Sequence, residues 1–77
     1  MRQPIESVLR EIDSLPDALG AVTVEVPDQL SLRGNSVPQD IALSIVVDRL
    51  LTRGYEPDSI EASDGVRIFR CKPVNAG

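Results

Sequence analysis

Histidine is missing from this sequence, and cysteine occurs only once, at Cys71. Histidine is the commonest general base, the usual partner of a nucleophilic serine or cysteine, and the commonest metal ligand. A single cysteine cannot form an intramolecular disulfide and excludes every CxxC metal or redox motif. The composition therefore predicts a protein that is not an enzyme, uses no cofactor and binds no metal ion.

Aromatic residues and long apolar runs are also scarce. Tyr55 and Phe69 are the only aromatic residues, so we expect a mainly aliphatic core. No apolar run reaches the 18 or so residues of a membrane span, and Glu6 follows Met1 too closely for a secretory signal. A lone cysteine also argues against an extracellular location for so small a domain. We therefore expect a cytoplasmic protein that does not associate with membranes.

The charge is unevenly distributed along the chain. The formal net charge is -4, which repels nucleic acid and anionic membranes. After Asp64, however, come Arg67, Arg70 and Lys72 without any acidic residue. The last strand is thus predicted to be a basic strip on an acidic body, at a sheet edge where it could face an acidic partner.

The first half of the sequence predicts a helix followed by a β-hairpin. Apolar residues at the i, i+3, i+4 and i+7 positions indicate an amphipathic helix over residues 4–14, which Pro16 ends. Alternation of apolar and polar residues then indicates two strands within residues 21–33, joined by a turn at Pro27-Asp28. The apolar residues that carry these patterns are Ile5, Val8, Leu9, Ile12, Val22, Val24, Val26, Leu30 and Leu32.

The second half repeats this order. Ser36 and Gln39 have the spacing of a capping box, which predicts a second helix from there to Arg53, with Gly54 as its left-handed stop. Residues 55–58 are expected to form a loop. Residues 60–63 and 66–72 then flank Asp64-Gly65, the preferred dipeptide of a type I′ hairpin.

These elements predict an α+β fold, a two-layer sandwich with the order α-β-β-α-β-β. The sheet is expected to be four-stranded and mainly antiparallel, with both helices on one face. Residues 1–72 form the single domain of this prediction, and residues 73–77 form a flexible C-terminal tail.

The second helix is apolar on more sides than a sheet can cover. A central group is expected to pack on the sheet, and it comprises Ala42, Leu43, Val46, Val47 and Leu50. Ile41, Ile45 and Leu51 are then left either for contact with the first helix or for another chain. The sequence leaves both alternatives open.

Other groups with chemical potential have plain structural interpretations. Cys71 is expected to pack inside a strand rather than to react. The acidic pairs Asp13 with Asp17, Glu56 with Asp58, and Glu61 with Asp64 fall at helix ends, loops or turns, where solvated acids are routine. The segment 33–36 leads into a helix N-terminus that could hold a phosphate, although the capping box favours an ordinary capped connection.

The main hypothesis is a non-catalytic protein-interaction module, acting as a regulator, inhibitor or accessory subunit. Its partner is another protein or, in a homodimer, a second copy. The candidate partner-binding residues are Ile41, Ile45, Leu51, Arg67, Arg70 and Lys72. Two alternatives are a weak nucleic-acid binder that uses the basic C-terminal strand, and an enzyme that uses carboxylates or arginines alone.

Overall fold

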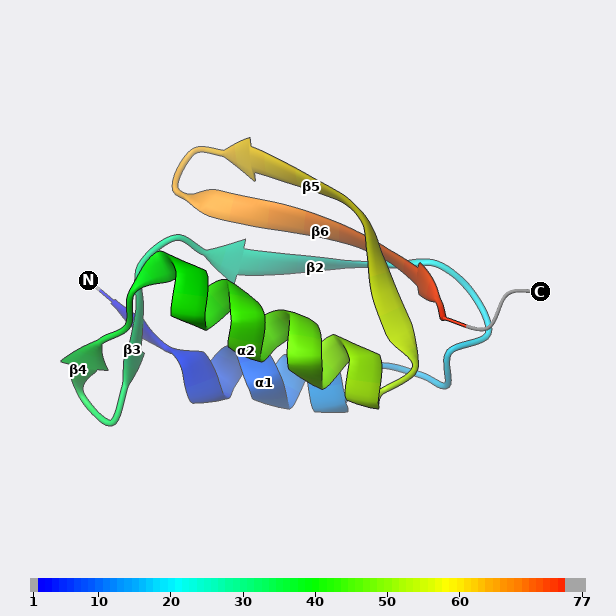
Figure 1. Cartoon of the computed structure of the whole chain (residues 1–77), viewed down its shortest axis with the longest axis horizontal. Helices are drawn as coiled ribbons and strands as arrows, with labels where there is room; N and C mark the ends of the chain where they lie inside the picture. The colour runs from blue at the N-terminus through cyan, green and yellow to red at the C-terminus, as the bar shows by residue number, and fades with distance from the viewer. Residues whose placement is uncertain (1, 75–77) are drawn as a thin grey trace.

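The computed structural model describes residues 2–74 and contains two helices and six strands in that range (Figure 1). In chain order they are β1 (Gln3–Pro4), α1 (Ile5–Asp13), β2 (Val22–Pro27), β3 (Leu30–Leu32), β4 (Asn35–Ser36), α2 (Gln39–Thr52), β5 (Tyr55–Ser63) and β6 (Val66–Pro73). Both predicted helices are present, and the α+β class is confirmed. The two-residue strands β1 and β4 were not predicted, because two residues carry no readable alternation.

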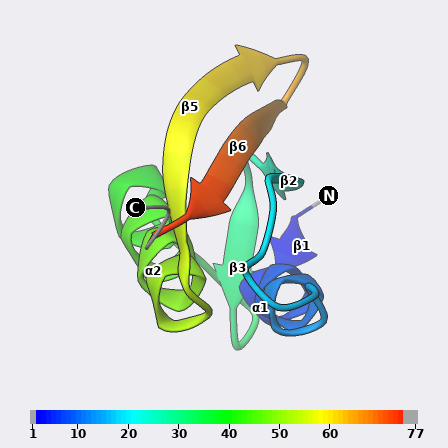
Figure 2. The same cartoon turned by 90° about the vertical axis from the view of Figure 1, so that its right-hand side faces the viewer.

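The strands form two three-stranded sheets, so the prediction of one four-stranded sheet was wrong. The larger sheet has the order β2-β6-β5, with antiparallel neighbours throughout. The smaller sheet has the order β1-β3-β4, in which β1 runs parallel to β3. Both helices lie on the same side of the larger sheet, as expected (Figures 1 and 2).

The predicted hairpin over residues 21–33 does not form. β2 pairs with β6, and β3 leaves to pair with β1 and β4. The connection between β2 and β3 consists of Asp28 and Gln29, neither of which has a positive φ. A two-residue hairpin requires at least one positive φ to match the twist of its strands. The chain therefore turns out of the larger sheet at this point.

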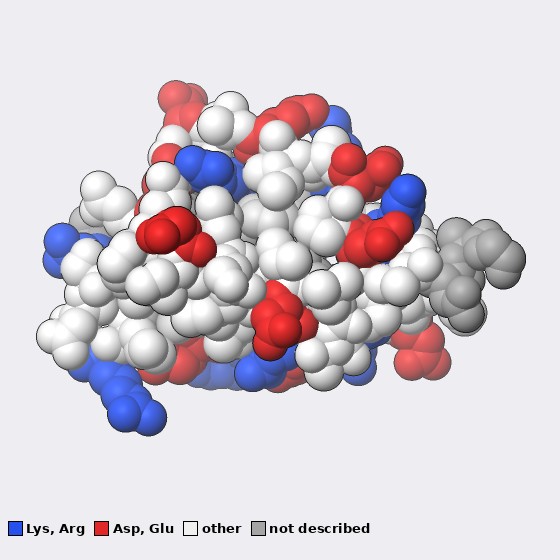
Figure 3. Space-filling view, in the orientation of Figure 1, with Lys and Arg blue, Asp and Glu red and all other residues white. Residues whose placement is uncertain are grey.

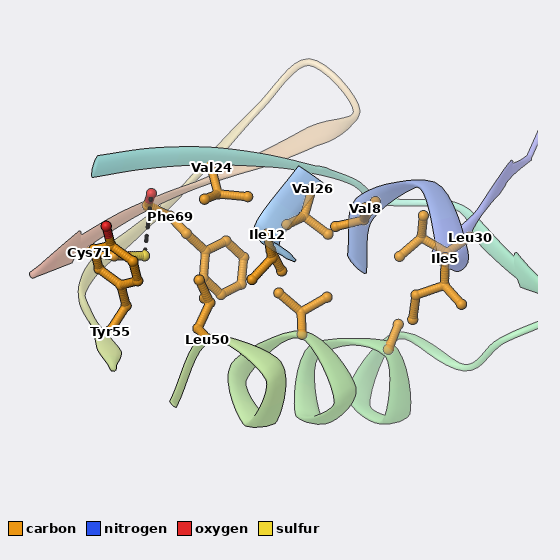
Figure 4. Packing of buried hydrophobic residues seen from close by; sticks show 12 residues of the cluster. Ile5, Val8, Ile12, Val24, Val26, Leu30, Leu50, Tyr55, Phe69 and Cys71 are labelled. Atoms are coloured by element: carbon orange, nitrogen blue, oxygen red, sulfur yellow. Dashed lines mark hydrogen bonds between the residues drawn. The ribbon is translucent and has the colours of Figure 1, made fainter. Parts of the chain in front are cut away.

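The core lies between the larger sheet and the two helices (Figure 4). One stripe of each helix is buried, and these residues are Ile5, Val8, Ile12, Ala42, Val46 and Leu50. Phe69 has no exposed surface, and Figure 4 shows its ring between Val24 of β2 and Leu50 of α2. Tyr55 is equally buried. The core is mainly aliphatic, with both aromatic residues at one end of it.

The start of α2 differs from the prediction, whereas its end does not. Ser36 belongs to β4, and the residue before the helix is Pro38, which makes no side-chain capping bond. The predicted capping box is therefore absent, because pairing of β4 with β3 takes Ser36 away from the helix end. Gly54 has a φ of 86°, the left-handed conformation predicted for the stop.

The β5–β6 hairpin has the predicted turn. Asp64 and Gly65 have φ values of 45° and 79°, as a type I′ turn requires. Residues 55–58, which were expected to form a loop, are instead the first part of β5, and the register shifts between Pro57 and Ser59. The local Pro-Asp signal thus marks a β-bulge inside a strand rather than a loop.

The C-terminal end of the described chain is held in place. Pro73, predicted to begin the tail, is the last residue of β6 and lies opposite Tyr55. The backbone N–H of Val74 donates to the carbonyl of Gly54 at 2.9 Å. Residues 75–77 of the predicted tail lie outside the described residues.

Gly54, the residue after the end of α2, lies close to Ala18, and a substitution tests this contact. Gly54→Ala is expected to lower the free energy of unfolding by about 2 kcal/mol, because alanine is strained at positive φ. Its Cβ would also lie 3.3 Å from the Cβ of Ala18. Gly65 also has a positive φ, but no atom lies within 4 Å of an added Cβ. Gly65→Ala is therefore expected to lower the free energy of unfolding by only about 1 kcal/mol. Urea unfolding followed by circular dichroism compares the two, and equal losses would contradict a role for Ala18.

Candidate functional site

One flank of α2 faces α1. Ile41, Ile45, Arg49 and Arg53 recur every four residues and so share one side of the helix. Arg49 Nη1 lies 2.6 Å from Oδ2 of Asp13 at the end of α1. Arg53 donates to a backbone carbonyl just after α1. Ile45 is partly buried against the core, whereas Ile41, one turn earlier, is 49% exposed.

The opposite flank of α2 carries Leu43, Val47 and Leu51, again at four-residue spacing. Leu43 and Val47 pack against the core and are partly buried. Leu51 is 48% exposed. The three residues of α2 that the sequence left for either helix contact or a partner therefore differ in exposure. Ile45 is covered within the monomer, whereas Ile41 and Leu51 remain on the surface, on different flanks of the helix.

Ile41 borders a cleft between the start of α2 and the β3–β4 hairpin. The cleft has a volume of about 300 Å³. Its lining residues are Leu32, Arg33, Asn35, Ser36, Val37, Pro38 and Ile41. The side chains of Leu32, Val37, Pro38 and Ile41 make it largely apolar. We call this site the Ile41 cleft. It can accept an aliphatic side chain of a partner.

The sequence pattern did not predict Leu32 as a site residue. Alternation placed it beside Leu30 in a hairpin with β2, and Leu30 is indeed buried. Leu32, however, is the last residue of β3 and is 40% exposed. The signal that could have revealed it is the Arg33-Gly34 pair that follows, since both residues have positive φ and form a tight β3–β4 turn.

The segment 33–36 was also considered as a phosphate-binding lead into α2. In the structure it forms that β3–β4 turn and strand β4 instead. The first turn of α2 carries the acidic side chain of Asp40, which already interacts favourably with the positive end of the helix dipole. The segment therefore serves to shape the Ile41 cleft.

The basic strip does not lie at a sheet edge. β6, which carries Arg67, Arg70 and Lys72, is the central strand of the larger sheet, so the predicted edge position was wrong. Side chains alternate along a strand, and Arg67 therefore lies on the same face as buried Phe69, whereas Arg70 and Lys72 lie on the outer face. The three cations do not form one surface.

Each cation of the basic strip lies beside an acidic side chain. Arg67 Nε is 3.6 Å from Oδ1 of Asp28, an ion pair too long to be a hydrogen bond. Arg70 pairs with Glu61 on β5. Lys72 Nζ lies 3.7 Å from Oε1 of Glu56 and 3.6 Å from Oδ1 of Asp58. A phosphate group would have to displace these carboxylates.

The same ion pairs account for several carboxylates that were considered for catalysis. The carboxylates of Glu56 and Asp58 pair with Lys72 of β6, and that of Glu61 pairs with Arg70 of the same strand. The carboxylate of Asp13 pairs with Arg49. Across residues 2–74, no three of the Asp, Glu and Cys side chains come close enough together to hold a metal ion.

Cys71 is buried on the inner face of β6, as predicted. Its Sγ lies 3.8 Å from the carbonyl oxygen of Phe69, the weak contact drawn in Figure 4. Burial raises the pKa of the Cys71 thiol above its ordinary value of 9.0, because a thiolate would lose its hydration there. The flanking cations Arg70 and Lys72 point to the opposite face and do not offset this.

Figure 3 shows the face of the molecule that displays α2 and β5. Most of this face is uncharged, with acidic side chains spaced apart on it and few basic ones.

Comparison with protein-family models, with curated proteins and with solved structures found no match. Within residues 2–74, neither helix combines the length and apolar character needed to cross a bilayer.

Proposed function

We propose that this protein is a small, non-catalytic protein-interaction module, a regulator, inhibitor or accessory subunit that binds its partner through the Ile41 cleft. The observation that carries the proposal is the concave apolar surface formed by Ile41, half exposed on α2, and Leu32, 40% exposed on β3. Two separate elements thus converge on one apolar cleft.

The energetics support a partner. Full burial of a leucine or isoleucine side chain contributes about 1.5–3 kcal/mol, so covering two half-exposed side chains contributes about that much in total. A 77-residue domain has a free energy of unfolding of only about 4–12 kcal/mol. Burial of this apolar surface by a partner would therefore add a considerable fraction of the domain's own stability to the complex.

The partner chemistry follows from the cleft. Its wall supplies aliphatic groups, and Arg33 at the rim supplies a positive charge next to Asn35 and Ser36. An aliphatic anchor side chain with an acidic neighbour fits this arrangement, because the anchor fills the apolar part and the acid meets Arg33. The ion pairs of β6 favour this surface over the basic strip as the binding site.

The test compares two variants of α2 in affinity capture from the native host. Ile41→Lys is expected to weaken retention of the partner at least about tenfold, because a lysine in the cleft loses the apolar contact. Leu51→Lys is the matched control, since Leu51 is equally exposed on the other flank, and it is expected to retain the partner. Mass spectrometry identifies the retained protein.

The outcomes separate clearly. Loss with Leu51→Lys alone would move the binding surface to the β5 flank and contradict the role of the Ile41 cleft. No specific retention by the unmodified protein would contradict the proposed function as a whole. Circular dichroism spectra of both variants check that each remains folded, as expected for side chains that are half exposed.

A further inference from the structure

The outer edge of β5 has no strand beside it. β5 is an edge strand of the larger sheet, and Figures 1 and 2 show no described element along its free side. Pro57 and the bulge at Asp58 interrupt the first part of this edge. The segment Ser59–Ser63 has neither proline nor lysine and is exposed throughout. Such a segment presents free backbone N–H and C=O groups to another strand.

A buried row of side chains ends at this edge. On the inner face, Val24 of β2 lies opposite Phe69 of β6, and Phe69 lies opposite Ile60 of β5. Val24 and Phe69 are almost fully buried, whereas Ile60 is 47% exposed. The row therefore stops at an apolar side chain that is only half covered.

We infer that a second copy of this chain pairs with the free edge of β5 in antiparallel orientation, with Ile60 opposite Ile60 of the second copy. This inference goes beyond the proposed function, because it uses the edge of β5 and not the Ile41 cleft. The two larger sheets then form one six-stranded sheet with a two-fold axis at Ile60. The inner row continues without interruption from Val24 through Phe69 and Ile60 of each copy.

The outer face of the sheet supports this register by its charges. With Ile60 opposite itself, Glu61 lies opposite Ser59 of the second copy. Ser59 is the neighbour of Arg70 across its own sheet. Each outer row therefore carries Glu61 of one copy and Arg70 of the other, separated by one serine. Glu61 and Arg70 already pair within each copy, so this register places the two ion pairs side by side with unlike charges nearest to each other.

Other registers with the same faces are less favourable. If Glu61 lay opposite Glu61, two like charges would face each other directly, which is destabilising. If Ser59 lay opposite Ser59, Ile60 would face the bulged Asp58, which already interacts with Lys72. A shift by a single residue would turn the inner face of one sheet toward the outer face of the other.

The contact is short, and this determines how it must be detected. Five residues of strand span about 17 Å, so the interface is smaller than the roughly 800 Å² per partner of a standard complex. The dimer is therefore expected to form at high protein concentration and to dissociate on dilution. No residue of β5 lines the Ile41 cleft, so the two proposed contacts use different residues.

Cysteine cross-linking tests both the contact and its register. Cys71 is buried, so an introduced cysteine on β5 is the reactive thiol in the described part of the chain. On mild oxidation, Ile60→Cys is expected to form a disulfide-linked dimer at least about ten times faster than Glu61→Cys, because only residue 60 meets itself. A mixture of Ser59→Cys with Glu61→Cys is expected to cross-link as well.

These positions cover both kinds of cross-strand pair. Neighbouring residues alternate between hydrogen-bonded and non-hydrogen-bonded pairs, whose Cα atoms lie about 5.5 and about 4.5 Å apart, and disulfides can span both distances. Faster cross-linking of Glu61→Cys alone, or no cross-linking at any of the three positions, would overturn the inference.

Sedimentation equilibrium over a concentration series provides the independent measurement. The unmodified protein is expected to show a mass that rises with concentration, and Ile60→Lys is expected to abolish the rise by placing two lysines opposite each other. Leu19→Lys is the control, because Leu19 is exposed in the connection between α1 and β2 and belongs to neither proposed surface. A mass that stays at the monomer value at all concentrations would overturn this inference. That result would not affect the proposed binding of a partner by the Ile41 cleft, which the capture experiment tests separately.

Discussion

Replacing Phe69 with alanine is expected to lower the free energy of unfolding by about 3–5 kcal/mol, the usual cost of removing a fully buried phenylalanine. Phe69 has no exposed surface and lies on the central strand, where Val24 and Ile60 flank it in the sheet and Leu50 faces it from α2. The surrounding structure relaxes only partly into such a cavity, which adds to the cost. Because a domain of this size has about 4–12 kcal/mol in total, the variant is expected to be close to unfolding.

Urea unfolding followed by circular dichroism measures this loss. The midpoint is expected to fall by at least about 2 M, given the small dependence on urea of so short a chain. Ile60→Ala is the control, since Ile60 occupies the neighbouring position in the same row but is half exposed, and it is expected to cost about 1 kcal/mol. Equal losses for the two variants would contradict the placement of Phe69 at the centre of the core.

The Cys71 thiol is expected to react with a thiol reagent at least about a thousand times more slowly in the native protein than in urea. Its side chain is buried, and burial raises its pKa, so reaction must wait for the strand to open. An opening free energy near the lower limit for a chain of this length already gives a factor of that order. The measurement is the rate of labelling by a chromogenic disulfide.

The same thiol reports on the first prediction. If opening of β6 requires global unfolding, Phe69→Ala raises the native labelling rate of Cys71 by at least about a hundredfold, since a loss of about 3 kcal/mol corresponds to slightly more than that factor. Ile60→Ala is expected to raise the rate only a few-fold. Labelling of the unmodified native protein at nearly the rate measured in urea would contradict the buried position of Cys71.

The elements that the sequence predicted correctly are those specified by local rules. The spacing of Ile5, Val8 and Ile12 defines α1, Gly54 ends α2 in the left-handed conformation, and Asp64-Gly65 forms the β5–β6 turn. Each of these signals lies within a few residues of its effect. Propensity and periodicity are informative at that range.

Strand pairing was predicted wrongly because it depends on residues that are far apart in the chain. Val22 lies opposite Cys71, and no local pattern announces that pairing. Pro27-Asp28 was taken as a hairpin turn, yet a turn without positive φ does not return the chain into the same sheet. Residues 55–58 were wrongly predicted as a loop because Pro57 was read as a strand breaker. A proline is compatible with an edge strand, and β5 takes that position only once it pairs with β6.

The candidate site was predicted in part. Ile41 and Leu51 were singled out because α2 is apolar on nearly all sides, and both are indeed half exposed. Arg67, Arg70 and Lys72 were expected on a free strip, but the register of β5 places Glu56, Asp58 and Glu61 beside two of them. Charge along a sequence does not show which opposite charges the fold brings next to it.

The position of β6 also bears on how the chain folds during synthesis. β6 is the last described strand, yet among the described strands it is the only sheet neighbour of β2. β2 already ends at Pro27, whereas β6 begins at Val66. Until β6 emerges, β2 and β5 have no partner in this sheet, and the apolar stripes of both helices have no layer to cover. The larger sheet and the core beneath it therefore form only after β6 has been made, and pairing over such a sequence separation slows that step.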